Sequence, residues 1–188
     1  MVSVSLSDLW LPILLSAVAV FLASNIMHMV LPHHKSDYAT LPKEDAVMSA
    51  LRPFQIPPGD YMMPRAGGMA EMKSEAFKAK WKQGPVAVIT FMTTDHNFMG
   101  RTMVQWFVYI LVVSTFAGYI ARRAVGRGAP YLEVSRFSST TAFACYGMAL
   151  WQNSIWYRRK WSTTLKSNID SLLYGFVTGG VMGWLWPR

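Results

Sequence analysis

The stretch LWLPILLSAVAVFLASNIMHMVL, residues 9–31, decides the fold class of this chain, because it holds no Asp, Glu, Lys or Arg. A helix needs about 20 predominantly apolar residues to cross a hydrocarbon core about 30 Å thick. Three further apolar runs follow at about residues 102–121, 137–156 and 169–186. The sequence therefore predicts an all-α polytopic membrane protein, a bundle of four transmembrane helices with a long extramembrane loop over residues 32–101.

Composition agrees with a membrane protein of one domain. Of the 188 residues, 52% are hydrophobic and 15% charged, whereas a soluble domain carries about 25% charged residues. We expect a single membrane domain over residues 1–188. No basic residue precedes the first run, which we interpret as a retained transmembrane helix rather than a signal peptide.

We attribute much of the net charge of +8 to basic residues that orient the membrane spans and attract anionic lipid. Basic residues gather at the ends of the apolar runs, where they orient the spans and attract anionic lipid. We expect the lipid bilayer as a partner and no nucleic acid, since no nucleic-acid-binding motif is present. The basic residues divide almost evenly between the two sides, with a slight excess that favours a cytoplasmic long loop.

The long loop is expected to contain short amphipathic elements. Proline early and acidic residues in the first turn predict a short helix over residues 42–51. A second helix is predicted over residues 69–82, lying on the membrane surface or against the bundle. Residues 86–92 favour a strand or an interfacial stretch. Side chains expected at the headgroup level are Trp81, Trp156, Trp161, Arg158 and Arg159.

The last apolar run carries a ladder of small residues, Ser171, Gly175, Gly179 and Gly183, spaced four apart on one helix face. Such ladders let a second helix approach to backbone contact. Ser114 and Gly118 offer a matching groove on the second predicted helix. The ladder packs either inside the same bundle or against another subunit, and the sequence leaves both open.

Three of the four histidines lie within seven residues, at the end of the first apolar run. His28, His33 and His34 are accompanied by Asp37, Met27 and Met29. Imidazole suits zinc and copper, and thioether suits Cu(I). This predicts a copper or zinc site, provided that Pro32 turns the later histidines back toward His28.

Two other interpretations bear on this region. The spacing of the histidines matches no recognised metal motif, so they are alternatively interfacial groups without a ligand. Haem is not expected, because only His28 lies in a membrane run.

Asp170 is expected in the first turn of the last helix, where a carboxylate suits the helix dipole.

Two segments carry a family resemblance: MHMVLPHHKSDYATLPKEDAVMSALR, residues 27–52, and WSTTLKSNIDSLLYGFVTGGVMGWLWP, residues 161–187. They resemble a family of small bacterial inner-membrane proteins with four helices and no established activity. The resemblance implies a multi-pass protein of the bacterial cytoplasmic membrane. It implies no catalytic residues.

The function we expect from these features is that of a non-catalytic accessory or assembly subunit of a larger membrane complex. No GxSxG, P-loop or Rossmann glycine set is present, and the single cysteine, Cys145, is expected to pack rather than react. The alternative is a metal-binding or redox- or quinone-linked membrane protein that uses the His28, His33 and His34 cluster.

Overall fold

The computed structural model describes residues 3–94 and 97–188. The chain divides into two compact units. Unit 1 comprises residues 1–39 and 97–188, and unit 2 comprises residues 40–96. The protein is mostly helical, as predicted, but unit 2 also holds a two-stranded sheet that an all-α class does not include.

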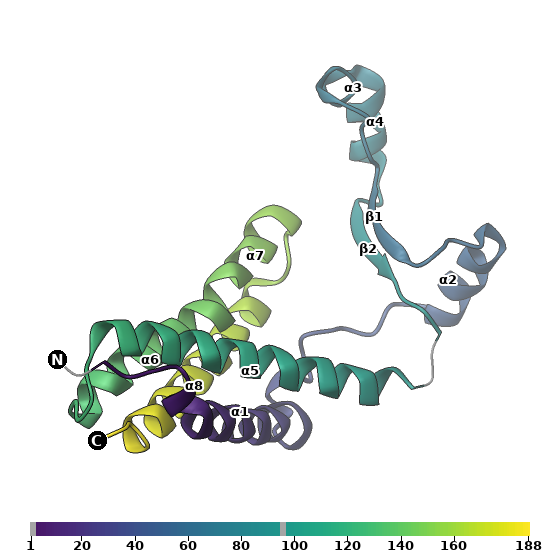
Figure 1. Cartoon of the computed structure of the whole chain (residues 1–188). Helices are drawn as coiled ribbons and strands as arrows, with labels where there is room; N and C mark the ends of the chain where they lie inside the picture. The colour runs from purple at the N-terminus through teal and green to yellow at the C-terminus, as the bar shows by residue number, and fades with distance from the viewer. Residues whose placement is uncertain (1–2, 95–96) are drawn as a thin grey trace. The chain divides into compact units, whose positions relative to one another are not determined.

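Unit 1 contains the long helices (Figure 1). Its elements are η1 (Ser7–Leu9), α1 (Trp10–Asn25), η2 (Ile26–Val30), η3 (Pro32–His34), α5 (Phe98–Ala124), α6 (Tyr131–Gly147), η5 (Met148–Leu150), α7 (Trp151–Tyr157) and α8 (Trp161–Trp184). The third predicted helix is thus broken by a 3₁₀ turn after Gly147. The fourth begins at Trp161, eight residues earlier than its apolar run.

Two helical segments are long and apolar enough to cross a membrane, Ser7–Val30 and Phe98–Ala124. In the described residues, the other two predicted spans are not among the helices apolar enough to qualify, although α8 has 24 residues. The reason lies in their composition, since α6 is rich in Ser and Thr and the first half of α8 is polar. Helix length and composition are therefore weak evidence that the protein lies in a membrane, and they do not support four spans.

The core of unit 1 forms two apolar clusters between its four long helices. α8 packs most extensively against α6, and α1 packs against both α5 and α8. One cluster gathers around Leu9, Ile13 and Met182, and the other around Val20, Ile110 and Val113. The outer faces stay apolar: Leu22, for example, is 58% exposed.

The small-residue ladder packs inside unit 1. A Cβ atom on Gly175 would lie 2.9 Å from the Ser139 carbonyl oxygen, and one on Gly183 would lie 2.8 Å from the Tyr131 carbonyl oxygen. The ladder therefore runs antiparallel along α6, in backbone contact. Gly118 instead lies against Leu9, Ile13 and Met182, and Ser114 is buried on α5.

Unit 2 is an antiparallel hairpin with short helices. Its elements are α2 (Glu44–Leu51), η4 (Arg52–Phe54), β1 (Gly59–Met63), α3 (Met69–Lys73), α4 (Glu75–Gln83) and β2 (Ala87–Phe91). In the sheet, Tyr61 pairs with Ile89. The helix predicted over residues 69–82 is divided at Ser74, where the backbone is extended. The Ser74 hydroxyl caps α4 by accepting a hydrogen bond from the Phe77 N–H.

Candidate metal centre

The histidine cluster is assembled by two backbone features at the end of α1. The helix finishes in one π-helical turn over Ile26–Val30, a local widening that is common at functional sites. Leu31 is then extended, as expected before proline. Pro32 opens the 3₁₀ turn η3, which carries His33 and His34 back toward His28.

Asp170 of α8 completes this cluster. The His34 imidazole stacks on His28, with ring centroids 4.3 Å apart. Its Nε2 atom lies 2.7 Å from Asp170 Oδ2, and its Nδ1 atom lies 2.7 Å from Asp37 Oδ2. His28, His34 and Asp170 each offer one donor atom, and these atoms lie within 4.8 Å of one another. His33 Nε2 stands 3.8 Å from Asp170 Oδ1.

Lys166 fixes the turn that carries these groups. Its ammonium donates to the His33 carbonyl at 2.7 Å, to Ser36 Oγ at 2.8 Å and to Asp37 Oδ1 at 3.1 Å. Burial raises the pKa of the Asp37 carboxyl, but the hydrogen bonds from His34 and Lys166 and the Lys166 charge outweigh burial. The net result is a pKa below the usual range for aspartate.

The donor set fits a divalent transition metal. Two imidazoles and a carboxylate, with a third imidazole beside them, are ligands of zinc and copper. Asp170 Oδ1 and His33 Nε2 are buried without a hydrogen-bond partner among the described residues. Donors that share an ion in tetrahedral geometry, with bonds of about 2.0–2.2 Å, stand about 3.3–3.6 Å apart. The donor atoms of this cluster lie within 4.8 Å of one another, and His34 Nε2 and Asp170 Oδ2 lie 2.7 Å apart. The widest pair therefore has to close by about 1 Å, and the His34–Asp170 pair has to open, before one ion can bind all three.

The predicted ligands divide into three groups. His28, His33 and His34 lie together, because the chain turns at Pro32 and brings the later histidines back toward His28, as the predicted site requires. Asp37 lies behind His34, where it orients the imidazole rather than facing Asp170. In the described residues, no hydrogen bond or ring contact joins Met27 or Met29 to the cluster, and Met29 is 75% exposed. Coordination of Cu(I) by these thioethers stays a prediction.

The prediction for Asp170 was wrong. Because α8 begins at Trp161, Asp170 lies in the third turn of the helix and is 2% exposed. The polar residues Ser162, Thr163 and Thr164 hid this start, since they resemble a loop. A signal was nevertheless present: Lys166, Asp170 and Tyr174 are spaced by four and share one helix face.

An aromatic cavity of about 250 Å³ adjoins the cluster within unit 1. His28 and Asp170 form part of its wall, together with Trp106, Tyr146 and Tyr174. The Trp106 indole donates to Ser24 Oγ at 2.9 Å, which ties α5 to α1 beside His28. These three aromatic residues were not predicted as site residues from the sequence.

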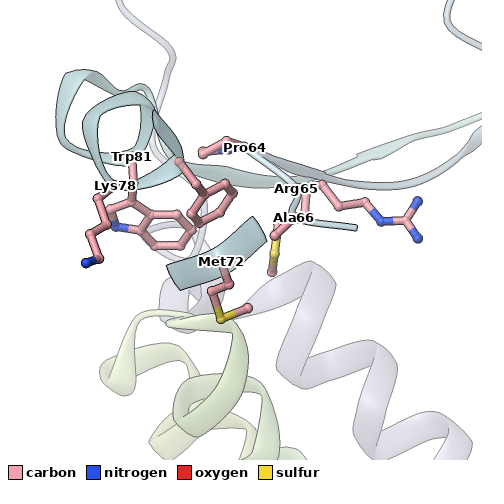
Figure 2. Close-up of a pocket in the computed structure, with 8 residues that line it drawn as sticks. Pro64, Arg65, Ala66, Met72, Lys78 and Trp81 are labelled. Carbon is pink, nitrogen blue, oxygen red and sulfur yellow. The ribbon is translucent and has the colours of Figure 1, made fainter. Parts of the chain in front are cut away.

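Unit 2 holds a separate apolar cavity of about 610 Å³ (Figure 2). Met62, Met72, Phe77 and Trp81 form most of its wall. The charged ends of Lys78 and Arg65 point away from it on opposite sides. Trp81, expected at the headgroup level, is thus a cavity residue. The other expected interfacial residues are exposed around the α7–α8 turn: Trp156, Arg158, Arg159 and Trp161.

Comparisons with known proteins found no matching family model, no similar curated protein and no similar solved structure. The resemblance to small bacterial inner-membrane proteins therefore stays a prediction. Function has to be inferred from the geometry of the chain itself.

Proposed function

We propose that this protein is a four-span membrane protein that binds one divalent transition metal ion, zinc or copper, at the end of its helix bundle. The observation that carries the proposal is the convergence of His28, His34 and Asp170. Their donor atoms come from distant parts of the chain, since His34 and Asp170 are 136 residues apart in the sequence. A buried carboxylate beside imidazoles is costly in apolar surroundings unless a cation or a proton compensates it.

The residues have separate roles in this proposal. His28, His34 and Asp170 are the ligands, and His33 is a fourth donor within reach of Asp170. Asp37 accepts from the far nitrogen of His34, the arrangement that fixes the tautomer and orientation of ligand histidines. Lys166 holds Asp37 and the His33 backbone in place. The ion would supply positive charge and open coordination positions beside the aromatic cavity.

The direct test is metal binding by the purified protein in detergent. After removal of metal with a chelator and loading with Zn²⁺ or Cu²⁺, we expect about one tightly held ion per chain by elemental analysis. Asp60→Asn, on β1 of unit 2, is the matched control and should retain the ion. Purified wild-type protein that binds no metal after loading and extensive washing would overturn the proposal.

The four-span arrangement is supported by packing rather than by hydropathy. α8 has 24 residues, and at about 1.5 Å per residue it is long enough to span. Its polar groups face the bundle interior: Thr178, Asn168 and Asp170 are buried, while Leu172 and Phe176 are exposed. In the most apolar 18-residue stretch of α5, only 28% of the residues are buried within the protein. This low fraction suits a lipid-facing helix better than the core helix of a soluble protein.

Labelling with a membrane-impermeant maleimide distinguishes four spans from two. In a Cys145→Ser background, single cysteines replace Ala39, which follows η3, and Ala124 and Tyr157, which are the last residues of α5 and α7. With four spans, positions 39 and 157 share one side and position 124 lies on the other. Positions 124 and 157 on the same side would instead indicate that only α1 and α5 cross the membrane.

A second candidate function is that of an assembly subunit, and the unit 2 cavity favours it. The ladder Gly175, Gly179 and Gly183 is occupied by α6 and gives this function no support. The cavity, by contrast, exposes apolar surface and has the basic residues Arg65 and Lys78 in its wall. The helices α3 and α4 carry a net excess of two positive charges, from Lys73, Lys78, Lys80 and Lys82 against Glu71 and Glu75. This surface fits an apolar segment flanked by acidic residues in another membrane subunit.

Site-specific photocrosslinking tests the second candidate. A benzophenone amino acid in place of Trp81 should crosslink one membrane protein through an apolar segment with acidic neighbours. The crosslinked product should disappear in the double variant Lys78→Glu, Lys82→Glu. The same probe in place of Trp184, in unit 1, should not give this product. Crosslinks to lipid alone, or a protein product that is insensitive to charge reversal, would reject this partner.

A further inference from the structure

The aromatic cavity of unit 1 has features of a ligand site in its own right. It lies between η2, α5, the α6–η5 segment and α8, and has a volume of about 250 Å³. Trp106 stacks with Tyr109 at 5.5 Å between centroids, while Tyr146 and Tyr174 meet edge to face at 5.6 Å. The Tyr109 hydroxyl donates to the Cys145 carbonyl, which fixes that ring. The wall is therefore largely aromatic.

Two phenol hydroxyls in this wall have no hydrogen-bond partner in the part of the chain that the structure describes. They belong to Tyr146, which is 7% exposed, and Tyr174, which is 4% exposed. Both side chains line the cavity, but their hydroxyl oxygens are buried against the protein, so each phenol has to turn to reach a ligand there. Buried hydroxyls in native proteins are normally paired. Two such groups, on facing helices around one cavity, indicate a ligand that accepts hydrogen bonds from both.

The size and surroundings of the cavity narrow the class of ligand. Its volume is below the range of about 300–1,000 Å³ typical of pockets that enclose drug-sized molecules, so it takes a single ring rather than a larger molecule. Aromatic walls favour a flat ring, and the two phenols favour carbonyl oxygens on it. The cavity is partly open and lies beside α5, one of the two membrane-span candidates, so we expect a ligand that is soluble in lipid.

We propose that this cavity binds the ring of a lipid-soluble quinone, with its carbonyl oxygens accepting hydrogen bonds from Tyr146 and Tyr174. Quinone binding at this site does not require the metal, because neither tyrosine belongs to the donor set. His28 and Asp170 border both sites, so a bound ring would lie next to the proposed ion. Its isoprenoid tail would extend between the helices into the bilayer.

Quinone binding is measured by titrating the detergent-purified full chain with decylubiquinone. We expect saturable binding that is weakened about 3- to 10-fold by Tyr146→Phe or Tyr174→Phe alone, since each removes one hydrogen bond and keeps the ring. The double variant should lose about 10-fold or more. Tyr157→Phe, an exposed phenol outside the cavity, should leave the dissociation constant unchanged.

A cavity-filling change provides a second, independent arm. Leu150→Phe places a larger side chain at the cavity wall and should abolish saturable binding while the thermal unfolding temperature is kept. Titration of chelator-treated protein separates this site from the metal site, because quinone affinity should survive metal removal. Absence of saturable binding, or equal affinity in the wild-type and double tyrosine variant, would overturn the proposal.

Discussion

Replacement of Asp170 by asparagine is expected to abolish metal binding, with an affinity loss well above about 100-fold. The carboxylate supplies the only negative charge among the three proposed ligands, and its Oδ2 atom lies 2.7 Å from His34 Nε2. Asparagine keeps the shape of the side chain but is a poor ligand beside imidazole. Elemental analysis and Zn²⁺ competition titrations provide the measurement.

Asp37→Asn provides the comparison that separates a ligand from a residue that positions a ligand. Asp37 contacts His34 through the opposite ring nitrogen, and such outer partners typically account for about 10–100-fold in metal affinity. We therefore expect weakened but measurable binding. If Asp170→Asn retains the ion, Asp170 is not a ligand. If the two variants lose affinity equally, the assignment of Asp170 as a ligand and of Asp37 as the residue that positions His34 is wrong.

Alanine at Gly179 is expected to destabilise the helix bundle strongly. A Cβ atom there would overlap Ser139 Oγ and would lie 2.7 Å from the Ser135 carbonyl oxygen. The serine side chain can rotate away, but the carbonyl is part of the α6 backbone, so α6 and α8 would have to separate. Overpacking of this kind costs about 1–3 kcal/mol, which should appear as a lowered thermal unfolding temperature in detergent.

The neighbouring Gly180 supplies a control at the same depth in the same helix. A Cβ atom on Gly180 would meet only the Tyr131 hydroxyl, at 3.6 Å, which is ordinary contact. Gly180→Ala should be neutral or stabilising, because alanine is favoured over glycine in a helix by about 1 kcal/mol. Equal unfolding temperatures for the two alanine variants would show that the close α6–α8 packing is not needed for stability.

The helices of unit 1 were largely predictable, and their boundaries were not. α1 and α5 are uninterrupted apolar runs, so composition located them directly. α8 begins eight residues before its apolar run, because Ser, Thr and Asn there face the bundle interior rather than water. The ladder predicted close packing correctly, but its partner groove on α6, Ser135 and Ser139, was overlooked although it shows the same spacing of four.

Unit 2 and the site show where local patterns stop being informative. β1 lies among prolines and glycines that predict an irregular loop, and only its pairing with β2 makes it a strand. The histidines could be recognised as candidates, but their convergence depends on a π-helical turn and on the direction of the chain after Pro32. Asp170 joins them from the far end of the sequence, a contact that no local pattern encodes.

The distance along the chain between His34 and Asp170 has a consequence for biosynthesis. A growing polypeptide exposes all three histidines well before the Asp170 carboxylate of α8 is made. The proposed ion-binding site is thus complete only in a chain in which α8 has been synthesised and docked. Bound metal would then distinguish molecules with a docked α8 from those without one.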